Sequence, residues 1–547
     1  MELHHQATPS RFNLNKPDWC DSFLTGPKAT IGSVTSNPSG LAHRQIYADP
    51  GNQRSVLAPA SGMGTIAIRG DRAELRGTLV TDIDARSRRF SPWIVWGSSM
   101  KWIFIAALLV MVPLVAAMLR SRPQYMPHAC FLVGCLPFFL NFHLYVAPIS
   151  WAYWPGIVKG IEVSLLDALA LGMLLANRAK VQTPTPIRIF FGVYVVGLVI
   201  STVTGQQAVP AIFYAWQLLR ALLVYLAVSR ATAVSPRAPF ALFAGVGAAV
   251  VFECVVASWQ HLHGVPQAGG TLGHRTGIGM MSHSAVMPAF ALFLGGSRRP
   301  FAIAIILAGA IIAYVGASRA TIGLYGLGLL ITLILSLRHK VSGRKLGIGL
   351  AAMVFLAISA PLAQLAISRR GAEDVQSSNQ ERNALTEAAQ MMIADHPFGV
   401  GANNYVLVAN IGGYSERAGV SWFHLSRSEP VHNSYLLVLA ELGWIGLIGL
   451  IGFLGCFIGL GWKALRKAPS GESSNLLVGM VGATIITAIH SGFEFVPMMF
   501  FMHYMFAINL GAVIGLIEAN KRLKRLPAAE VSQHMPTDIE TRQPVTV

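Results

Sequence analysis

Residues 430–462 read PVHNSYLLVLAELGWIGLIGLIGFLGCFIGLGW. A polar segment that contains His432 and Asn433 leads directly into an apolar run over 436–462. A helix of about 20 apolar residues is long enough to cross the hydrocarbon core of a bilayer. This stretch therefore predicts a membrane helix that starts at a polar, hydrated boundary.

Similar apolar runs recur along the chain of 547 residues, which is 53% hydrophobic and only 12% charged. Soluble domains carry about 25% charged residues, so the composition indicates a membrane protein. Helices satisfy their own backbone groups in lipid, which predicts an all-α, polytopic integral membrane helical bundle of about 12–13 transmembrane helices. The twelve predicted spans and a thirteenth segment that precedes them cover 127–146, 160–177, 189–205, 208–229, 239–260, 284–297, 301–317, 320–337, 346–364, 436–462, 476–493, 498–518 and 94–119.

Short basic loops separate successive pairs of these runs, which is typical of the cytoplasmic side of a membrane protein. The larger loops, 261–283 and 365–433, then lie on the opposite side of the membrane. Loop 365–433 holds five Lys and Arg against seven Asp and Glu, and it is long enough to fold. Ser378 and Glu381 form a candidate capping box that starts a helix, and Pro397 ends it. We therefore predict one large non-cytoplasmic loop that contains helices.

Three regions follow from this organisation: a tail over 1–93, the membrane bundle over 94–525, and a C-terminal tail over 526–547. The first tail is rich in Ser, Gly, Pro, Asn and Arg and has no sustained period, which predicts disorder. Thirteen spans would place it outside, whereas the arginines at 86–89 favour the cytoplasm. We expect both tails to be disordered and cytoplasmic.

The net charge of +17 does not indicate nucleic-acid binding, because the basic residues lie mainly in short loops between apolar runs. The five cysteines are scattered and show no disulfide or metal pattern. The histidines around His261 and His263 fit no zinc spacing with a carboxylate or thiolate ligand. We therefore expect no metal, no cofactor and no nucleic-acid partner, and membrane lipids around the bundle.

Arg319 lies between two apolar runs, where an arginine is costly unless it faces water or an anion. Its planar fork of donors suits a phosphate, whereas the alternative is a side chain that reaches the lipid headgroups. Arg275 lies in a glycine-rich loop that is able to wrap an anion. Arg220 lies within a span and is either a functional residue or the partner of Asp167 or Glu253 in an ion pair.

Arg382 lies near the predicted start of the loop helix, where the helix dipole disfavours a cation. A functional role would explain this placement, and the alternative is an ordinary exposed arginine. His432 is a candidate general base, for which it needs a pKa near neutrality and access to a hydroxyl. The alternative is a histidine that caps a helix at the membrane interface. His490, Glu494 and His503 are interpreted as structural polar contacts.

Three motifs in order resemble the superfamily of O-antigen ligases and O-antigen polymerases. Ser318-Arg319 opens a membrane helix, HPFGVGANNY over 396–405 resembles a family turn, and HNSYL over 432–436 with ELGWIG over 441–446 resembles the family signature. The resemblance covers roughly 130–520, so the tail over 1–93 lies outside it.

The resemblance implies transfer of a glycan from undecaprenyl diphosphate to an acceptor hydroxyl, at the periplasmic face of the bacterial inner membrane, so that loop 365–433 would be the large periplasmic loop. The resemblance also implies that the transfer is inverting and needs neither a nucleotide sugar nor a metal. Arg319 and Arg382 would stabilise the diphosphate leaving group, and His432 would take the acceptor proton. Asn433 would orient His432 or the substrate, with Arg275 and Arg220 as further substrate-binding residues.

The acceptor is lipid A–core in the ligases and another glycan in the polymerases, and the motifs do not separate the two. The long tail favours an exopolysaccharide or O-antigen polymerase. The alternative is a secondary transporter, but transporters use discontinuous helices and acidic sites near the midplane. Here acids within the spans are few, and the candidate polar residues fall on one face, which favours an enzyme.

Overall fold

The apolar runs form helices in the computed structural model. The described residues are 98–523, apart from 143, 369–371 and 497–498. Nine helices among them are long and apolar enough to cross a membrane. These are α3 (Ser98–Ser121), α6 (Thr185–Thr204), α7 (Ala208–Val234), α8 (Ala238–Leu262), α9 (Arg275–Gly295), α11 (Arg319–His339), α17 (Ser434–Lys467), α18 (Glu472–His490) and α19 (Phe500–Leu523). The protein is therefore a polytopic all-α membrane protein, as predicted; its predicted tails, 1–93 and 526–547, lie outside the described residues.

The other predicted segments also form helices: α4 (Met126–Phe139), α5 (Leu165–Ala176), α10 (Arg299–Val315) and α12 (Gly343–Ser368). Three of them, α4, α5 and α10, have 14, 12 and 17 residues. A full span needs about 20 residues. The apolar runs thus locate the helices correctly. However, more spans are predicted than there are helices among the described residues that are long and apolar enough to cross a membrane.

A β-hairpin replaces parts of two predicted spans, 127–146 and 160–177. The strands β1 (Tyr145–Ser150) and β2 (Gly160–Ser164) pair antiparallel. Ser164 ends the hairpin because its hydroxyl accepts from the backbone N–H of Asp167, and the Asp167 carboxylate accepts from the N–H of Ser164. This capping box starts α5 at Leu165, so the apolar run was read as a helix that began five residues too early.

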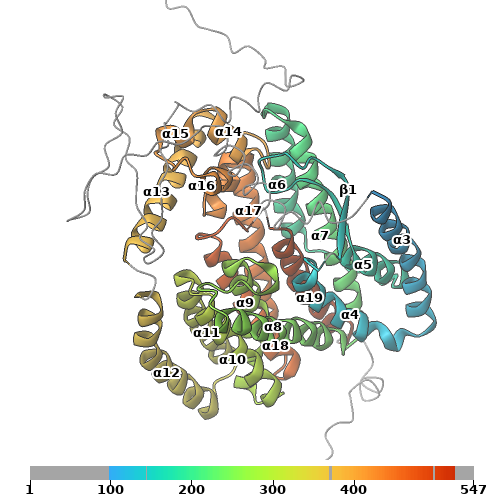
Figure 1. Ribbon diagram of the computed structural model, residues 1–547. Coiled ribbons are helices and arrows are strands. Elements are labelled where there is room, and N and C mark those ends of the chain that lie inside the picture. The colour runs from blue at the N-terminus through green and yellow to red at the C-terminus, as the bar shows by residue number, and fades with distance from the viewer. Residues whose placement is uncertain (1–97, 143, 369–371, 497–498, 524–547) are drawn as a thin grey trace, which may run out of the picture. The chain divides into compact units, whose positions relative to one another are not determined.

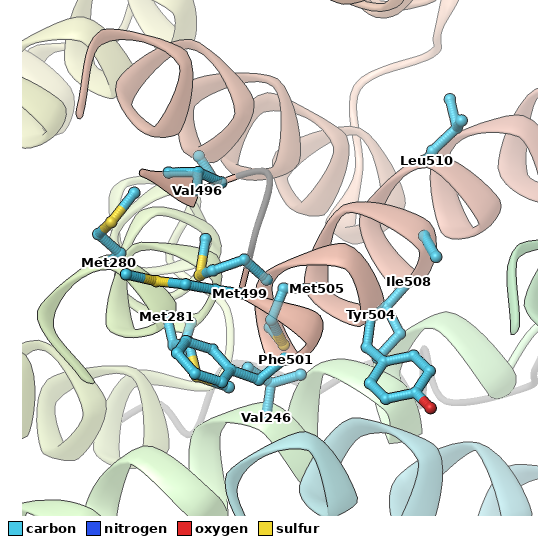
Figure 2. Packing of buried hydrophobic residues seen from close by; sticks show 14 of the residues in the cluster. Val246, Met280, Met281, Val496, Met499, Phe501, Tyr504, Met505, Ile508 and Leu510 are labelled. Carbon is cyan, nitrogen blue, oxygen red and sulfur yellow. The ribbon is translucent and has the colours of Figure 1, made fainter. Parts of the chain in front are cut away.

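Three pairs of long helices that are distant in sequence pack together: α7 with α19, α6 with α17, and α9 with α18 (Figure 1). Helix α9 also packs against its neighbours in the chain, α8 and α10. Between α8, α9 and α19 the core is rich in methionine (Figure 2). Met280 and Met281 are fully buried there, beside Phe501 and Met505. Unbranched thioether side chains fill irregular gaps between helices, which suits them to this junction.

Loop 365–433 contains helices, as predicted: α13 (Ala372–Asp395), α14 (Tyr405–Ile411), α15 (Tyr414–Arg417) and α16 (His424–Ser428). Figure 1 shows them gathered near one end of α17. The predicted start of α13 is wrong, because Ser378 and Glu381 lie inside the helix rather than at its first turn. Its end is correct, since α13 stops at Asp395, just before His396 and Pro397.

Helix α17 is broken at Gly443, where φ is 67° and ψ is −170°. The sequence predicted one continuous span here, so the break is a correction. The carbonyls that the break releases are used by the loop: Val400 N–H donates to Ala440 O, and Gly401 N–H donates to Glu441 O, both at 2.9 Å. Non-helical backbone at membrane depth needs such partners, because lipid offers none.

Glu441 and Asn403 join this turn to the β-hairpin. The buried Glu441 carboxylate accepts from the backbone N–H groups of Asn403 (2.9 Å) and Tyr405 (3.0 Å). The Asn403 amide in turn donates to Val158 O at 2.6 Å and accepts from Val158 N–H at 3.1 Å. Two of the motifs recognised in the sequence are therefore physically interlocked, and they fix the beginning of α17.

Candidate active site

The start of α17 is fastened to the connection between α18 and α19. Ser434 N–H donates to Ser491 O at 2.8 Å, and Val496 N–H donates to the Ser434 hydroxyl at 2.9 Å. The Ser434 hydroxyl itself donates to the backbone carbonyl of Glu494. Two membrane-helix ends that are about 60 residues apart in the chain are thereby held together, and His432 lies beside Glu494.

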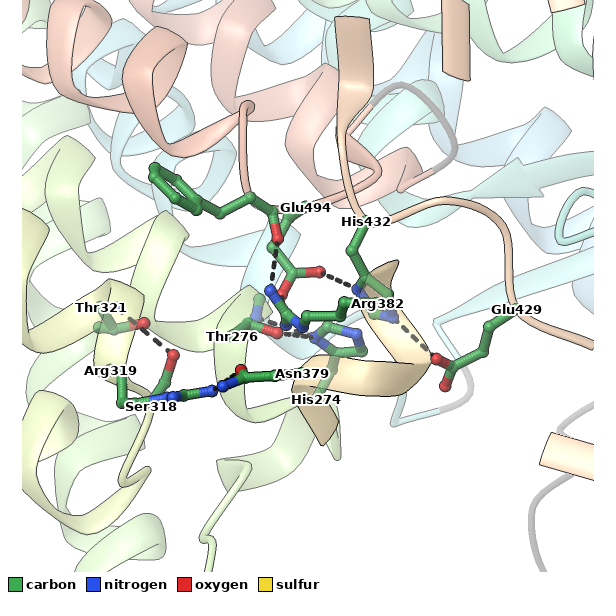
Figure 3. Close-up of polar contacts among 12 residues, drawn as sticks. His274, Thr276, Ser318, Arg319, Thr321, Asn379, Arg382, Glu429, His432 and Glu494 are labelled. Carbon is green, nitrogen blue, oxygen red and sulfur yellow. Dashed lines mark hydrogen bonds and ion pairs between the residues drawn. The ribbon is translucent and has the colours of Figure 1, made fainter. Parts of the chain in front are cut away.

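His432 lies between two carboxylates (Figure 3). Its Nδ1 is 3.3 Å from Glu494 Oε2, and its Nε2 is 2.9 Å from Glu429 Oε2. The ring also packs edge-on against Phe495, with 5.2 Å between the centroids. The two carboxylates differ in exposure, since the Glu494 side chain is 1% exposed and that of Glu429 is 48% exposed.

This arrangement shifts the pKa of both partners. Burial alone would lower the pKa of His432, but the hydrogen bonds to Glu429 and Glu494 raise it above its ordinary value. Burial would raise the pKa of Glu494, but its contact with His432 and the charges of His274 and Arg382 lower it to about 2. Glu494 is therefore a buried carboxylate that remains ionised at neutral pH.

Arg382 contacts the same buried carboxylate from the loop side. Its Nη2 is 3.4 Å from Glu494 Oε1, and its Nη1 donates to the Phe493 carbonyl at 3.3 Å. The expected position near a helix start is wrong, because α13 begins at Ala372 and Arg382 lies in its interior. The helix dipole therefore gives no reason to assign Arg382 a special role. The contact with Glu494 is instead the observation that places Arg382 in the site.

Arg319 is the first residue of α11, as the sequence predicted, and Ser318 is the N-cap. Its side chain is exposed, and its Nη2 donates to Asn379 Oδ1 at 2.7 Å. Asn379 and Arg382 lie three residues apart on α13 and hence on one face of that helix. Helix α13 thus brings Arg319 next to the group formed by Arg382, Glu494 and His432 (Figure 3).

His274 reaches this group from the start of α9, and Arg275 is its neighbour in the chain. His274 caps the helix, since its Nδ1 accepts from Gly277 N–H at 2.9 Å, and its ring lies edge-on to Phe495. Burial lowers the pKa of His274, against the opposing charge of Glu494. Arg275 follows as the first residue of α9 and is half-buried.

Asn433 is the N-cap of α17. Its Oδ1 accepts from the backbone N–H groups of Tyr435 at 3.0 Å and Leu436 at 3.1 Å. The side-chain oxygen of Asn433 is therefore used to start the helix directly after His432.

Arg220 lies in a separate, buried ion-pair cluster. Its Nη1 is 2.8 Å from Glu162 and its Nε is 2.9 Å from Asp167. Its guanidinium group also lies over the Tyr504 ring. Of the two alternatives for Arg220, this geometry matches the ion pair with Asp167, while Glu253 bonds to Thr271 instead.

The sequence analysis assigned no role in the site to Glu494, Glu429 or Asn379. Glu494 carried a signal, because an acid between Phe493 and Phe495 in an apolar region needs a partner, but it was interpreted as a structural contact. Glu429 and Asn379 lie in a polar loop and carried none. Throughout the described residues, no group of three or more His, Cys, Asp or Glu is placed to hold a metal ion.

The fold defines a multi-pass membrane protein in which imidazole, carboxylate and guanidinium groups meet at one end of its long helices. Residues 283–451 match the family model described as O-antigen ligase. The matched region contains all three motifs that predicted a resemblance to this superfamily, and the family that it resembles indicates an enzyme that transfers glycans. The family implies a lipid-linked glycan and an acceptor of the lipid A–core kind. No curated protein matches the chain.

Proposed function

We propose that the protein transfers a glycan from undecaprenyl diphosphate to an acceptor hydroxyl, on the periplasmic face of the bacterial inner membrane. One observation carries this proposal: α13 joins Arg319 and Arg382 to the pair formed by His432 and Glu494. A base and two fixed cations are the groups that such a transfer requires.

In the proposed reaction the acceptor oxygen forms a bond to the anomeric carbon of the donor glycan. The bond from that carbon to the diphosphate oxygen breaks, and its electron pair leaves with the lipid diphosphate. The acceptor proton passes to the Nε2 atom of His432, while Glu494 holds Nδ1. Attack from the face opposite the leaving group inverts the anomeric centre, and Arg319 and Arg382 stabilise the charge that develops on the diphosphate.

The charge pattern of α17 supports the periplasmic side. His432 and Asn433 lie directly before the helix, whereas Arg466 and Lys467 lie in its last turn. Cytoplasmic loops are enriched in Lys and Arg. The opposite end, which carries His432, then faces the periplasm.

The principal test replaces His432 or Arg319 by alanine. We expect each variant to remain in the membrane but to lose glycan transfer by about 100-fold or more, since general bases and charge-stabilising groups contribute at that level. The measurement is the yield and length distribution of polymer or capped lipid A–core in a deletion strain that expresses each variant. Wild-type yield and chain length in both variants would refute the proposal.

Matched controls on the same side are His261→Ala and Arg417→Ala, which remove exposed side chains outside the site. Both should retain transfer. Treatment with EDTA should also leave the rate unchanged, because guanidinium groups, rather than a metal, balance the diphosphate. The glycolipids of the deletion strain then separate the two reactions: uncapped lipid A–core indicates a ligase, and accumulated single repeat units indicate a polymerase.

A further inference from the structure

Glu429 lies where the chain enters the site, one residue after α16. Its Oε2 is 2.9 Å from Nε2 of His432, and its side chain is 48% exposed. Glu494, on the other ring nitrogen, is sealed from water at 1% exposed. One carboxylate of the pair is therefore fixed by packing, and the other is free to rotate into water.

Both hydrogen bonds can form together only in one protonation state of the ring. A neutral imidazole has one N–H and one bare nitrogen, so it donates to only one carboxylate. The ring donates to two ionised carboxylates only in its charged form, in which both nitrogens are protonated. A base needs a bare nitrogen within about 2.6–3.2 Å of the hydroxyl that it deprotonates. The nitrogen that faces away from Glu494 is Nε2, and Glu429 now covers it.

We propose that Glu429 occupies the acceptor subsite, and that the acceptor hydroxyl displaces its carboxylate from Nε2 of His432. The inference rests on the proposed function and adds the place where the acceptor sugar binds. A hydroxyl oxygen within hydrogen-bonding distance of Nε2 would overlap the present position of Glu429 Oε2, so the two cannot bind together.

Displacement also prepares the base. As the Glu429 carboxylate leaves, His432 loses one of the two hydrogen bonds that raise its pKa, so the Nε2 proton passes to water beside the half-exposed Glu429 and the neutral ring becomes more populated. By displacing Glu429, the acceptor therefore exposes the bare Nε2 atom that then takes the proton of the acceptor hydroxyl. Rotation of one half-exposed side chain is sufficient, and no movement of the backbone is needed.

The other charged groups around His432 remain in place during this step. They are Glu494 on the connection from α18, Arg382 on α13, and His274 with Arg275 at the start of α9. Removal of Glu429 should therefore change the protonation of His432 without dismantling the site. This separates Glu429 from Glu494, which also orients the ring.

The test measures transfer by the full-length protein over a range of pH, at saturating lipid-linked donor and varied acceptor. For Glu429→Gln we expect the acid limb of the pH profile to shift to lower pH, with the rate at high pH retained. For Glu429→Ala we expect the same shift and a KM for the acceptor that is lower by about threefold to tenfold, since a charged hydrogen bond no longer has to be displaced. The matched control is Glu387→Gln, which removes an exposed acid on α13.

An unshifted acid limb together with an unchanged KM would overturn the inference. Loss of the rate at high pH would also overturn it, because Glu429 would then belong to the reacting groups. Failure of this inference can be told apart from failure of the proposed function. If the His432→Ala variant is active, both the proposed function and the acceptor subsite are refuted. If His432→Ala is inactive but the pH profiles of the Glu429 variants do not shift, only the acceptor subsite is refuted.

Discussion

At the scale of single residues, the pair formed by Glu494 and His432 is strongly dependent on pH. The pKa of Glu494 is lowered from 4.5 to about 2, so its stabilising contribution is present above 4.5 and is lost as pH falls through about 2. The pKa of His432 is raised above 6.5, so its contribution is full below 6.5 and is lost as pH rises through the raised value. The pair should stabilise the fold most between pH 4.5 and 6.5, whereas catalysis needs the neutral ring at higher pH.

Replacing Glu494 by glutamine should therefore affect both properties. The amide can donate to Nδ1 and favour the wrong tautomer of His432, for which we expect a rate about 100-fold lower or more at every pH. The thermal midpoint in detergent should fall more at pH 5 than at pH 8, because the charged pair is lost only where His432 is protonated. Transfer assays and thermal unfolding at the two pH values measure this, and Glu518→Gln is the control. A wild-type rate would contradict the orienting role.

The sequence pointed to His432 through a motif and to Arg319 through its costly position and its motif, whereas it singled out Arg382 through a helix start that the structure places elsewhere. It did not identify what surrounds them. Glu494 is 62 residues from His432, and their contact depends on Ser434, which fastens two helix ends. Pairings of this kind require the packed fold, and hydropathy does not encode them.

At the scale of elements, the break in α17 decides how the loop meets the membrane helices. Sequence periodicity did not reveal it, because the residues on both sides of Gly443 are apolar and the helix contains many other glycines. The start of α13 was misplaced for a related reason: a good capping sequence was present at Ser378, but the helix continues through it. Local signals predicted that these helices exist, whereas tertiary contacts set where they bend and begin.

Gly443→Ala should destabilise the protein and impair transfer. A Cβ at this position would lie 2.5 Å from the carbonyl carbon of Phe398, and the backbone has a positive φ of 67°. Left-handed backbone and overpacking each cost about 1–2 kcal/mol or more. The matched control is Gly455→Ala on the same helix, where a Cβ meets nothing within 4 Å. Thermal unfolding in detergent compares them, and equal midpoints would contradict the interpretation.

At the scale of the whole molecule, the predicted topology assigns the two ends of the bundle to different compartments. The helices α9, α11 and α17 all begin at the candidate site, next to His274, Arg319 and His432, and α18 ends just before Ser491, which contacts the start of α17. Basic residues lie at the opposite ends of α11 and α17. The sequence predicts a common face for these ends from the charge asymmetry between loops, which is a property of the whole chain.

Single cysteines test the two sides in a background without the five native cysteines. Ser421→Cys lies exposed in the loop between α15 and α16, and Ser470→Cys lies exposed between α17 and α18. We expect a membrane-impermeant maleimide to label the first in intact cells and the second only after lysis. Labelling in the reverse order would invert the topology, and the background should retain glycan transfer as the control.

The parts of the site come from two kinds of structure. His432 and Glu494 are held by the ends of membrane helices, whereas Arg382 and the partner of Arg319 belong to α13, a helix of the large loop. Substitutions on one helix of the loop can therefore change how the leaving group is bound, while His432 and Glu494 remain held by the membrane helices. Such modularity would let the binding of the lipid diphosphate change without any change in the residues that transfer the proton.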